Sequence, residues 1–286
     1  MRLFSRRILI LTSVLLAMLT GTASAADVYN PSPDTAVSEY GVTTYLDLAR
    51  HFVPDIKATD NGYVGSKRVA LRHIGGKGYE GADESAYGFY DLAAVRMKAE
   101  GKERLLVLFD FAQAAKAAQG LAVLALYELD NEPRLLDAAD IGFDQGTYFF
   151  DQTLMPIAEG SDAILTMSSH FNSNQTYTTQ ALAMVKADRL ELIGTALLFD
   201  ERTCGLERRQ TIRYAADPAR GKPYAPISVT VTESAMPTDE TCEGTQAISA
   251  SEREIRITYT WNAADNKYRA DSDNLTKLAI ENERRF

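Results

Sequence analysis

The amino-acid sequence predicts an all-β protein made of antiparallel hairpins, with one short helix before the strands and another after them. Polar and apolar residues alternate along 227–232 and 253–261, and a period of two is typical of strands that bury one face. Residues 105–109 and 121–126 are continuously apolar, which indicates strands buried on both faces. Turn-forming residues separate these segments, as expected for hairpins.

Three polar segments are expected to be hairpin turns, namely 130–133, 186–188 and 264–266, because Asp, Asn and Pro favour the backbone conformations of tight turns. Further strands are predicted at 68–74, 89–97, 134–141, 148–154, 163–168, 181–185, 190–193 and 208–214. Residues 41–286 are accordingly expected to form a single all-β domain.

The two helices are predicted from their caps and from the spacing of apolar residues. Thr43 or Thr44 is expected to cap the first helix and Pro54 to end it, since these residue types favour those positions. Ser272 is expected to cap the second helix, which runs to Arg285. The apolar faces comprise Tyr45, Leu48, Ala49 and Phe52 in the first helix and Leu275, Leu278 and Ala279 in the second.

A weak internal repeat runs along the chain. Glu100-Gly101-Lys102 precedes a strand, a loop and a hairpin, Glu159-Gly160-Ser161-Asp162 precedes a similar series, and a looser third copy begins at Gly221-Lys222. A four-stranded unit of roughly 60 residues has the size of a propeller blade. The layout is loosely similar to integrin-type propeller repeats, but their calcium-binding aspartates are missing and no membership is inferred. The expected fold is propeller-like, or a large sandwich or half-barrel, and ordinary look-alike hairpins explain the repeat equally well.

The first 25 residues are organised like a secretory signal peptide. A basic start containing Arg6-Arg7 is followed by the apolar residues 8–19 and by Thr22-Ala23-Ser24-Ala25, a cleavage site with small residues. The apolar run is about a dozen residues, whereas a membrane-spanning helix needs roughly 20. We therefore expect a cleaved signal peptide at 1–25, a flexible tether at 26–40, and a periplasmic or secreted protein without an integral membrane span.

The charge of the chain restricts its partners. The formal net charge is −9, and loss of the signal peptide, with its three arginines and no acid, would make it −12. Because a negative surface repels phosphate groups, nucleic acid and anionic membranes are not expected as partners. An envelope protein, a small molecule or a carbohydrate is expected instead.

Cys204 and Cys242 are the two cysteines of the sequence. In an oxidising compartment such a pair is expected to form one disulfide, and the alternative is two buried thiols. Their spacing is not C-x-x-C, so a redox-active site is not expected.

Sequence motifs of known catalytic and metal sites are missing. The nucleophile pattern G-x-S-x-G does not occur. None of the three histidines, His51, His73 and His170, has the spacing to another histidine or to a cysteine that zinc sites use. The sequence therefore predicts no metal site and no cofactor, and it identifies no catalytic residue.

The main candidate for ligand binding is the segment 168–177, whose sequence is S-S-H-F-N-S-N-Q-T-Y. It is expected to be a loop that interrupts a pair of apolar strands with hydrogen-bonding groups, an imidazole and two aromatic rings. Amides and aromatic rings recognise carbohydrates or peptides, although a loop whose side chains bond their own backbone has the same composition. The predicted ligand-binding residues are His170, Asn172, Asn174, Gln175 and Tyr177.

Two functions from different classes are compatible with these observations. The first is a non-catalytic role in binding a ligand or a protein partner. The alternative is a glycosidase-like hydrolase that uses carboxylates, because a catalytic carboxylate pair requires no sequence motif. An exposed aromatic patch would favour binding, and a deep cleft with two carboxyl groups of raised pKa would favour hydrolysis.

Overall fold

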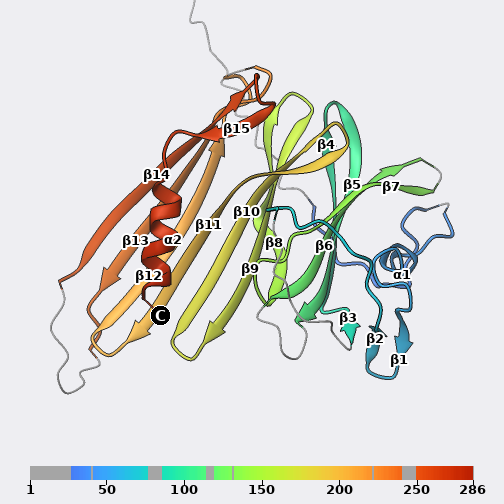
Figure 1. Ribbon diagram of the computed structural model, residues 1–286, viewed down its shortest axis with the longest axis horizontal. Coiled ribbons are helices and arrows are strands. Elements are labelled where there is room, and N and C mark those ends of the chain that lie inside the picture. The colour runs from blue at the N-terminus through green and yellow to red at the C-terminus, as the bar shows by residue number, and fades with distance from the viewer. Residues whose placement is uncertain are drawn as a thin grey trace, which may run out of the picture.

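Figure 1 shows the computed structural model of the protein. It describes residues 27–39, 41–76, 86–113, 119–130, 132–220, 222–239 and 249–285. The expected signal peptide and Cys242 lie outside the described residues, so signal cleavage and the Cys204–Cys242 bridge stay predictions.

The described chain is mostly β, in antiparallel sheets with a short helix on either side, and this confirms the predicted fold class. The helices are α1 (Tyr45–Ala49) and α2 (Asn274–Glu283). The strands are β1 (Lys57–Thr59), β2 (Gly62–Gly65), β3 (Tyr87–Gly88), β4 (Asp91–Ala99), β5 (Lys102–Gln113), β6 (Gly120–Leu129), β7 (Pro133–Asp140), β8 (Gly146–Ala158), β9 (Ser161–Asn172), β10 (Gln175–Lys186), β11 (Arg189–Thr203), β12 (Leu206–Ala216), β13 (Ile227–Met236), β14 (Ser251–Asn262) and β15 (Lys267–Ala270). The three predicted hairpin turns join β6 to β7, β10 to β11 and β14 to β15, as expected.

The strands form three sheets in which neighbours along the chain are neighbours in space. β1, β2 and β3 form a small sheet, β4 to β7 form a four-stranded sheet, and β8 to β15 form an eight-stranded sheet. Every paired neighbour is antiparallel. Most of the connections are hairpins too short for the crossover that parallel pairing requires.

Alternate side chains of the central strands contribute to successive hydrophobic cores. On β5, Leu105 and Val107 pack in the core that contains α1, whereas Leu106 and Leu108 pack in the core shared with the eight-stranded sheet. The four-stranded sheet is thus buried on both faces, as its continuously apolar sequence predicts.

The eight-stranded sheet is likewise covered on both faces near β10. Ala183 packs toward the four-stranded sheet, and its neighbours Leu182 and Met184 pack in a third core with β12–β15 and α2. Figure 1 shows the resulting series of layers, with α1 at one end, the two sheets in the middle and α2 against the far part of the eight-stranded sheet.

The repeat units of the sequence, which begin near residues 100, 159 and 221, correspond to β5–β8, β9–β12 and β13–β15. The turns that open the first two are in contact, because Gly101 N donates a hydrogen bond to Gly160 O at 2.8 Å. The second and third units share one sheet, to which β8 of the first unit also belongs, so the units do not form separate blades. Of the expected folds, the structure therefore matches the sandwich, with part of the eight-stranded sheet extending beyond the two packed sheets. The propeller-like expectation is wrong.

The first helix has the predicted cap. Asp47 N donates to Thr44 Oγ1 (3.2 Å) and Thr44 N donates to Asp47 Oδ2 (3.0 Å), which is a capping box. For the second helix the predicted cap at Ser272 is wrong: the cap residue is Asp273, which makes no side-chain capping bond. Asp271 still pairs with Thr258 of β14 through its backbone amide (3.0 Å), so the chain leaves the sheet later than its sequence suggests.

The predicted strand at 68–74 is also wrong. Only its end pairs with β7, where Asp140 N donates to Arg72 O and Ile74 N donates to Asp140 O, both at 2.9 Å. The alternation of apolar residues is local, but a strand also needs a partner along its length.

Part of the expected tether lies against the sheets. Tyr29 and Ala94 of β4 exchange two backbone hydrogen bonds, of 3.0 and 2.9 Å, and the hydroxyl groups of Tyr29 and Tyr45 are 2.8 Å apart. Val37 is buried in the core around α1.

Among the described residues, no helix has the length and apolar character that a membrane crossing requires.

Candidate functional site

The five predicted ligand-binding residues lie at one end of the β9–β10 hairpin. The expected loop is wrong, because the ladder continues to Asn172 and Gln175 and leaves only Ser173 and Asn174 as the turn. A two-residue turn suffices because Ser173 adopts the left-handed conformation (φ 49°).

The structure separates these five residues by their surroundings. Asn172 and Asn174 are exposed at the hairpin tip. Gln175 accepts a hydrogen bond from the Tyr177 hydroxyl (2.6 Å), and Tyr177 is buried. His170 pairs with Tyr177 across the ladder, and their rings stack with centroids 4.6 Å apart.

His170 also lines a groove, which we name the aromatic groove. Its lining comprises Tyr90, Gln145, Gly146, Tyr148, Ser169, His170 and Phe171, and its volume is about 370 Å³. Phe171 is 81% exposed and Tyr90 is 74% exposed. Exposed apolar side chains that lie together are typical of interaction sites, whereas those scattered singly over a surface are normal.

Three separate segments build the aromatic groove. Tyr90 comes directly before β4, where its amide donates to Asp110 O (2.8 Å). Gly146 opens β8 and pairs with Ser169 of β9. Gly146 lies against both the Tyr90 ring and the Asp110 carboxylate, each of which would be 3.8 Å from a Cβ at this position, an ordinary van der Waals contact.

The imidazole of His170 is held in place on two sides. Its Nδ1 lies 2.6 Å from Asp144 Oδ2, and its ring rests on that of Tyr177. Asp144 is itself fixed, because its other carboxylate oxygen accepts from Gln145 N at 2.8 Å. This arrangement presents the imidazole to the groove in one orientation.

Sequence reasoning included His170 and the segment with Phe171 but missed Tyr90, Gln145 and Tyr148. Nothing in the sequence distinguishes these three from ordinary residues at strand ends, because they reach the groove only through the pairing of β8 with β9 and the packing of β4 behind them.

Carboxyl groups with raised pKa values occur elsewhere in the molecule. Burial raises the pKa of Asp140, of Asp162 and of Asp200. Backbone amides of Gly142, Lys98 and Gln210, respectively, donate to them. None of the three lines the aromatic groove. They lie on three different strands, β7, β9 and β11, and each accepts a structural hydrogen bond from its own backbone amide partner.

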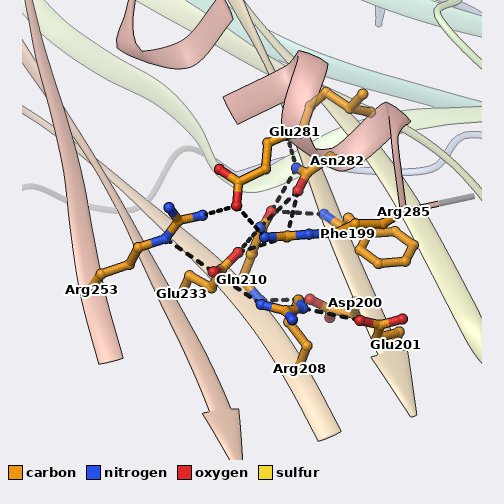
Figure 2. Close-up of polar contacts among 11 residues, drawn as sticks. Phe199, Asp200, Glu201, Arg208, Gln210, Glu233, Arg253, Glu281, Asn282 and Arg285 are labelled. Carbon is orange, nitrogen blue, oxygen red and sulfur yellow. Dashed lines mark hydrogen bonds and ion pairs between the residues drawn. The ribbon is translucent and has the colours of Figure 1, made fainter. Parts of the chain in front are cut away.

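A dense set of charges lies between α2 and the eight-stranded sheet, and we name it the Glu233 cluster (Figure 2). Glu233 is buried and interacts with Arg208 (3.1 Å), Arg253 (3.0 Å) and Arg285 (2.8 Å). Burial raises the pKa of Glu233, but hydrogen bonds from Arg285, Gln210 and Arg253 outweigh it and bring the pKa to about 2.

The arginines of the Glu233 cluster have further carboxylate partners. Arg208 also binds Glu201 (3.0 Å), while Arg253 and Arg285 both bind Glu281 of α2. The charges thus neutralise one another and fasten the end of α2 to β12, β13 and β14. We interpret this cluster as a structural clamp.

The clamp closes a place where the eight-stranded sheet is partly open. β11 and β12 pair only through Glu201–Thr203 and Leu206–Arg208. Beyond that point side chains replace the ladder bonds: Phe199 N donates to Gln210 Oε1 and Asn282 Nδ2 donates to Leu197 O, both at 2.9 Å. Buried backbone groups therefore keep partners although the strands diverge.

Within the described residues, no three His, Cys, Asp or Glu side chains lie close enough to hold a metal ion. No family model matches the chain, and comparisons with curated proteins and with solved structures find no similar protein.

Proposed function

We propose that this chain is an exported, non-catalytic binding protein whose aromatic groove takes a neutral carbohydrate. The observation that carries the proposal is the pair of highly exposed rings, Tyr90 and Phe171, beside a groove of about 370 Å³. Export rests on the signal-like residues 1–25.

The shape and chemistry of the groove suit a sugar. A sugar ring has an apolar face of C–H groups, which packs on an aromatic ring, and an edge of hydroxyl groups, which needs polar partners. Tyr90 and Phe171 supply the first kind of surface, and Gln145, Ser169 and His170 supply the second. The volume lies near the lower end of small-ligand sites, which span roughly 300–1,000 Å³.

The lining also favours a neutral ligand. Among the described residues that line the groove there is no Asp, Glu, Lys or Arg, so a charged ligand would lose hydration there without gaining a partner of opposite charge. This feature favours an uncharged saccharide over a charged peptide.

The hydrolase alternative has weaker support. A glycosidase needs two carboxyl groups on either side of the scissile bond, roughly 5–10 Å apart. The described lining of the groove provides none. Of the carboxylates beside it, Asp144 is engaged by His170, and Asp110 accepts a hydrogen bond from Thr147 N at 2.8 Å.

Titration calorimetry with cellohexaose, maltohexaose and chitohexaose tests the proposal. At least one of these sugars should bind, and the double variant Tyr90→Ala/Phe171→Ala should weaken its Kd at least tenfold. Met236→Ala, which removes an exposed apolar side chain outside the groove, should leave the Kd unchanged. Failure of all three sugars to bind, or an unchanged Kd in the double variant, would refute the carbohydrate assignment.

Chromatography of the same sugars after incubation distinguishes binding from hydrolysis. The proposal expects each hexasaccharide to stay intact, and shortened products that vanish with an Asp144→Asn variant would establish the hydrolase instead. A quadruple variant with alanine at positions 170, 172, 174 and 175 tests the hairpin residues predicted from the sequence. Unchanged binding in that variant would remove them from the site.

A further inference from the structure

A second concave site lies where β11 and β12 diverge. We name it the interstrand cavity. It has a volume of about 250 Å³. The lining residues that matter to its chemistry are Phe150, Met167, Gln180, Leu198, Asp200 and Ile212.

The interstrand cavity is distinct from the aromatic groove. The described linings of the two sites share no residue. They approach each other at the end of the β9–β10 hairpin, where Phe171 of the groove pairs with Thr176 of the cavity. They are separate sites on neighbouring parts of the same sheet.

One polar atom of the cavity wall is left without a partner. Gln180 is 2% exposed, and its Oε1 is buried and accepts no hydrogen bond from the described residues. Its amide nitrogen faces the Met167 sulfur at 3.8 Å, which orients Oε1 as the free acceptor. A buried acceptor of this kind is costly in a folded protein unless a donor reaches it.

The other lining residues indicate what kind of molecule would carry this donor. Phe150, Met167, Leu198 and Ile212 provide apolar surface around the amide. Asp200 adds a second polar group, but one of its oxygens already accepts from Gln210 N at 2.6 Å. Burial raises the pKa of Asp200, and the same loss of hydration disfavours a charged ligand in the cavity.

The cavity is held open by the rest of the structure. Gln210 and Asn282 occupy the gap between β11 and β12 with hydrogen bonds to the backbone, and the Glu233 cluster fastens α2 behind them. Because these contacts fix the two strands, ligand binding would order little of the backbone. Gln180 Oε1 itself exposes less than 1 Å², so its side chain must turn toward the cavity for a donor to reach it.

We propose that the interstrand cavity binds a small, uncharged molecule that has an aromatic or aliphatic body and one hydroxyl or N–H donor directed at Gln180 Oε1. Phenol represents this class, and toluene has nearly the same size without the donor. The proposal does not depend on carbohydrate binding in the aromatic groove.

Chemical-shift titration of the protein with ¹³C-labelled methionine methyl groups tests the proposal, since Met167 lines the cavity. Phenol should shift the Met167 signal and bind at least tenfold more tightly than toluene. In Gln180→Met, which replaces the amide by an apolar chain of similar length, this preference should disappear. Met236, far from the lining, serves as the internal control signal.

Two outcomes would overturn the proposal. One is a Met167 signal in wild-type protein that does not shift at any phenol concentration at which the protein stays folded. The other is equal affinity of the wild-type protein for phenol and toluene, which would mean that Gln180 Oε1 takes no part and that water satisfies it. Both outcomes are read from wild-type protein and stay decisive if the variant does not fold.

Discussion

Replacing Glu233 by glutamine should destabilise the protein strongly at neutral pH and little in acid. The side chain of Glu233 is 7% exposed and forms ion pairs with three arginines. Glutamine has the same shape but no charge, so the variant keeps the packing and resembles the protonated form of the native residue.

The magnitude follows from the pKa of Glu233, which is about 2 in place of the ordinary 4.5. A depressed carboxyl pKa contributes stability that is fully present above the unfolded value and is lost as the pH falls through the folded value. Linkage then assigns to ionised Glu233 about 3 kcal/mol at pH 7, about 1.4 kcal/mol at pH 3 and under about 0.5 kcal/mol at pH 2. The free energy of unfolding that Glu233→Gln loses relative to the wild-type protein should depend on pH in the same way.

Urea denaturation followed by circular dichroism at pH 7, 4, 3 and 2 measures this difference between the two proteins. Glu254→Gln is the matched control, because Glu254 lies on neighbouring β14 and pairs with Arg256 at the surface. The free energy of unfolding of Glu254→Gln should stay within about 1 kcal/mol of the wild-type value at every pH. A Glu233→Gln loss that equals the control loss at pH 7, or that does not change between pH 7 and pH 2, would refute the reasoning.

Three further predictions concern single features of the fold. Gln180→Met should raise the free energy of unfolding by roughly 1 kcal/mol in urea, because it removes a buried acceptor without a donor, and a loss of stability would contradict this. Gly160→Ala should lower the melting temperature more than Gly62→Ala. Both glycines have positive φ, but only at Gly160 would a Cβ meet another residue, Gly101 Cα at 3.0 Å; equal losses would show that the two turns do not press on each other. Mass spectrometry of a non-reduced digest should find a peptide pair joined through Cys204 and Cys242, and two free thiols would disprove the bridge.

Much of the secondary structure was predictable because its signals are local. The alternation along 253–261 and the continuous apolar run at 105–109 correspond to β14 and β5. Thr44 caps α1 with side chains only three residues apart. The segment 68–74 shows the limit of this reasoning, because its pattern suits a strand but most of its length has no partner to pair with.

The candidate site was predictable only in part. His170 could be singled out because an unusual polar segment surrounds it, but its partner Asp144 is 26 residues away. Tyr90 and Tyr148 join the same groove from different segments. The Glu233 cluster and the interstrand cavity could not be predicted, because the residues that form them are spread between positions 150 and 285 of the sequence.

The sequence by itself determined the all-β class, the hairpins and the acidic charge, because strand period, turn chemistry and charge depend on neighbouring residues or on composition. Only the tertiary structure decided that the second and third repeat units share one sheet, that exposed rings meet beside His170, and that the sheet opens between β11 and β12. These features arise from contacts between distant segments, where packing and hydrogen bonding select one arrangement among several that the same local patterns allow.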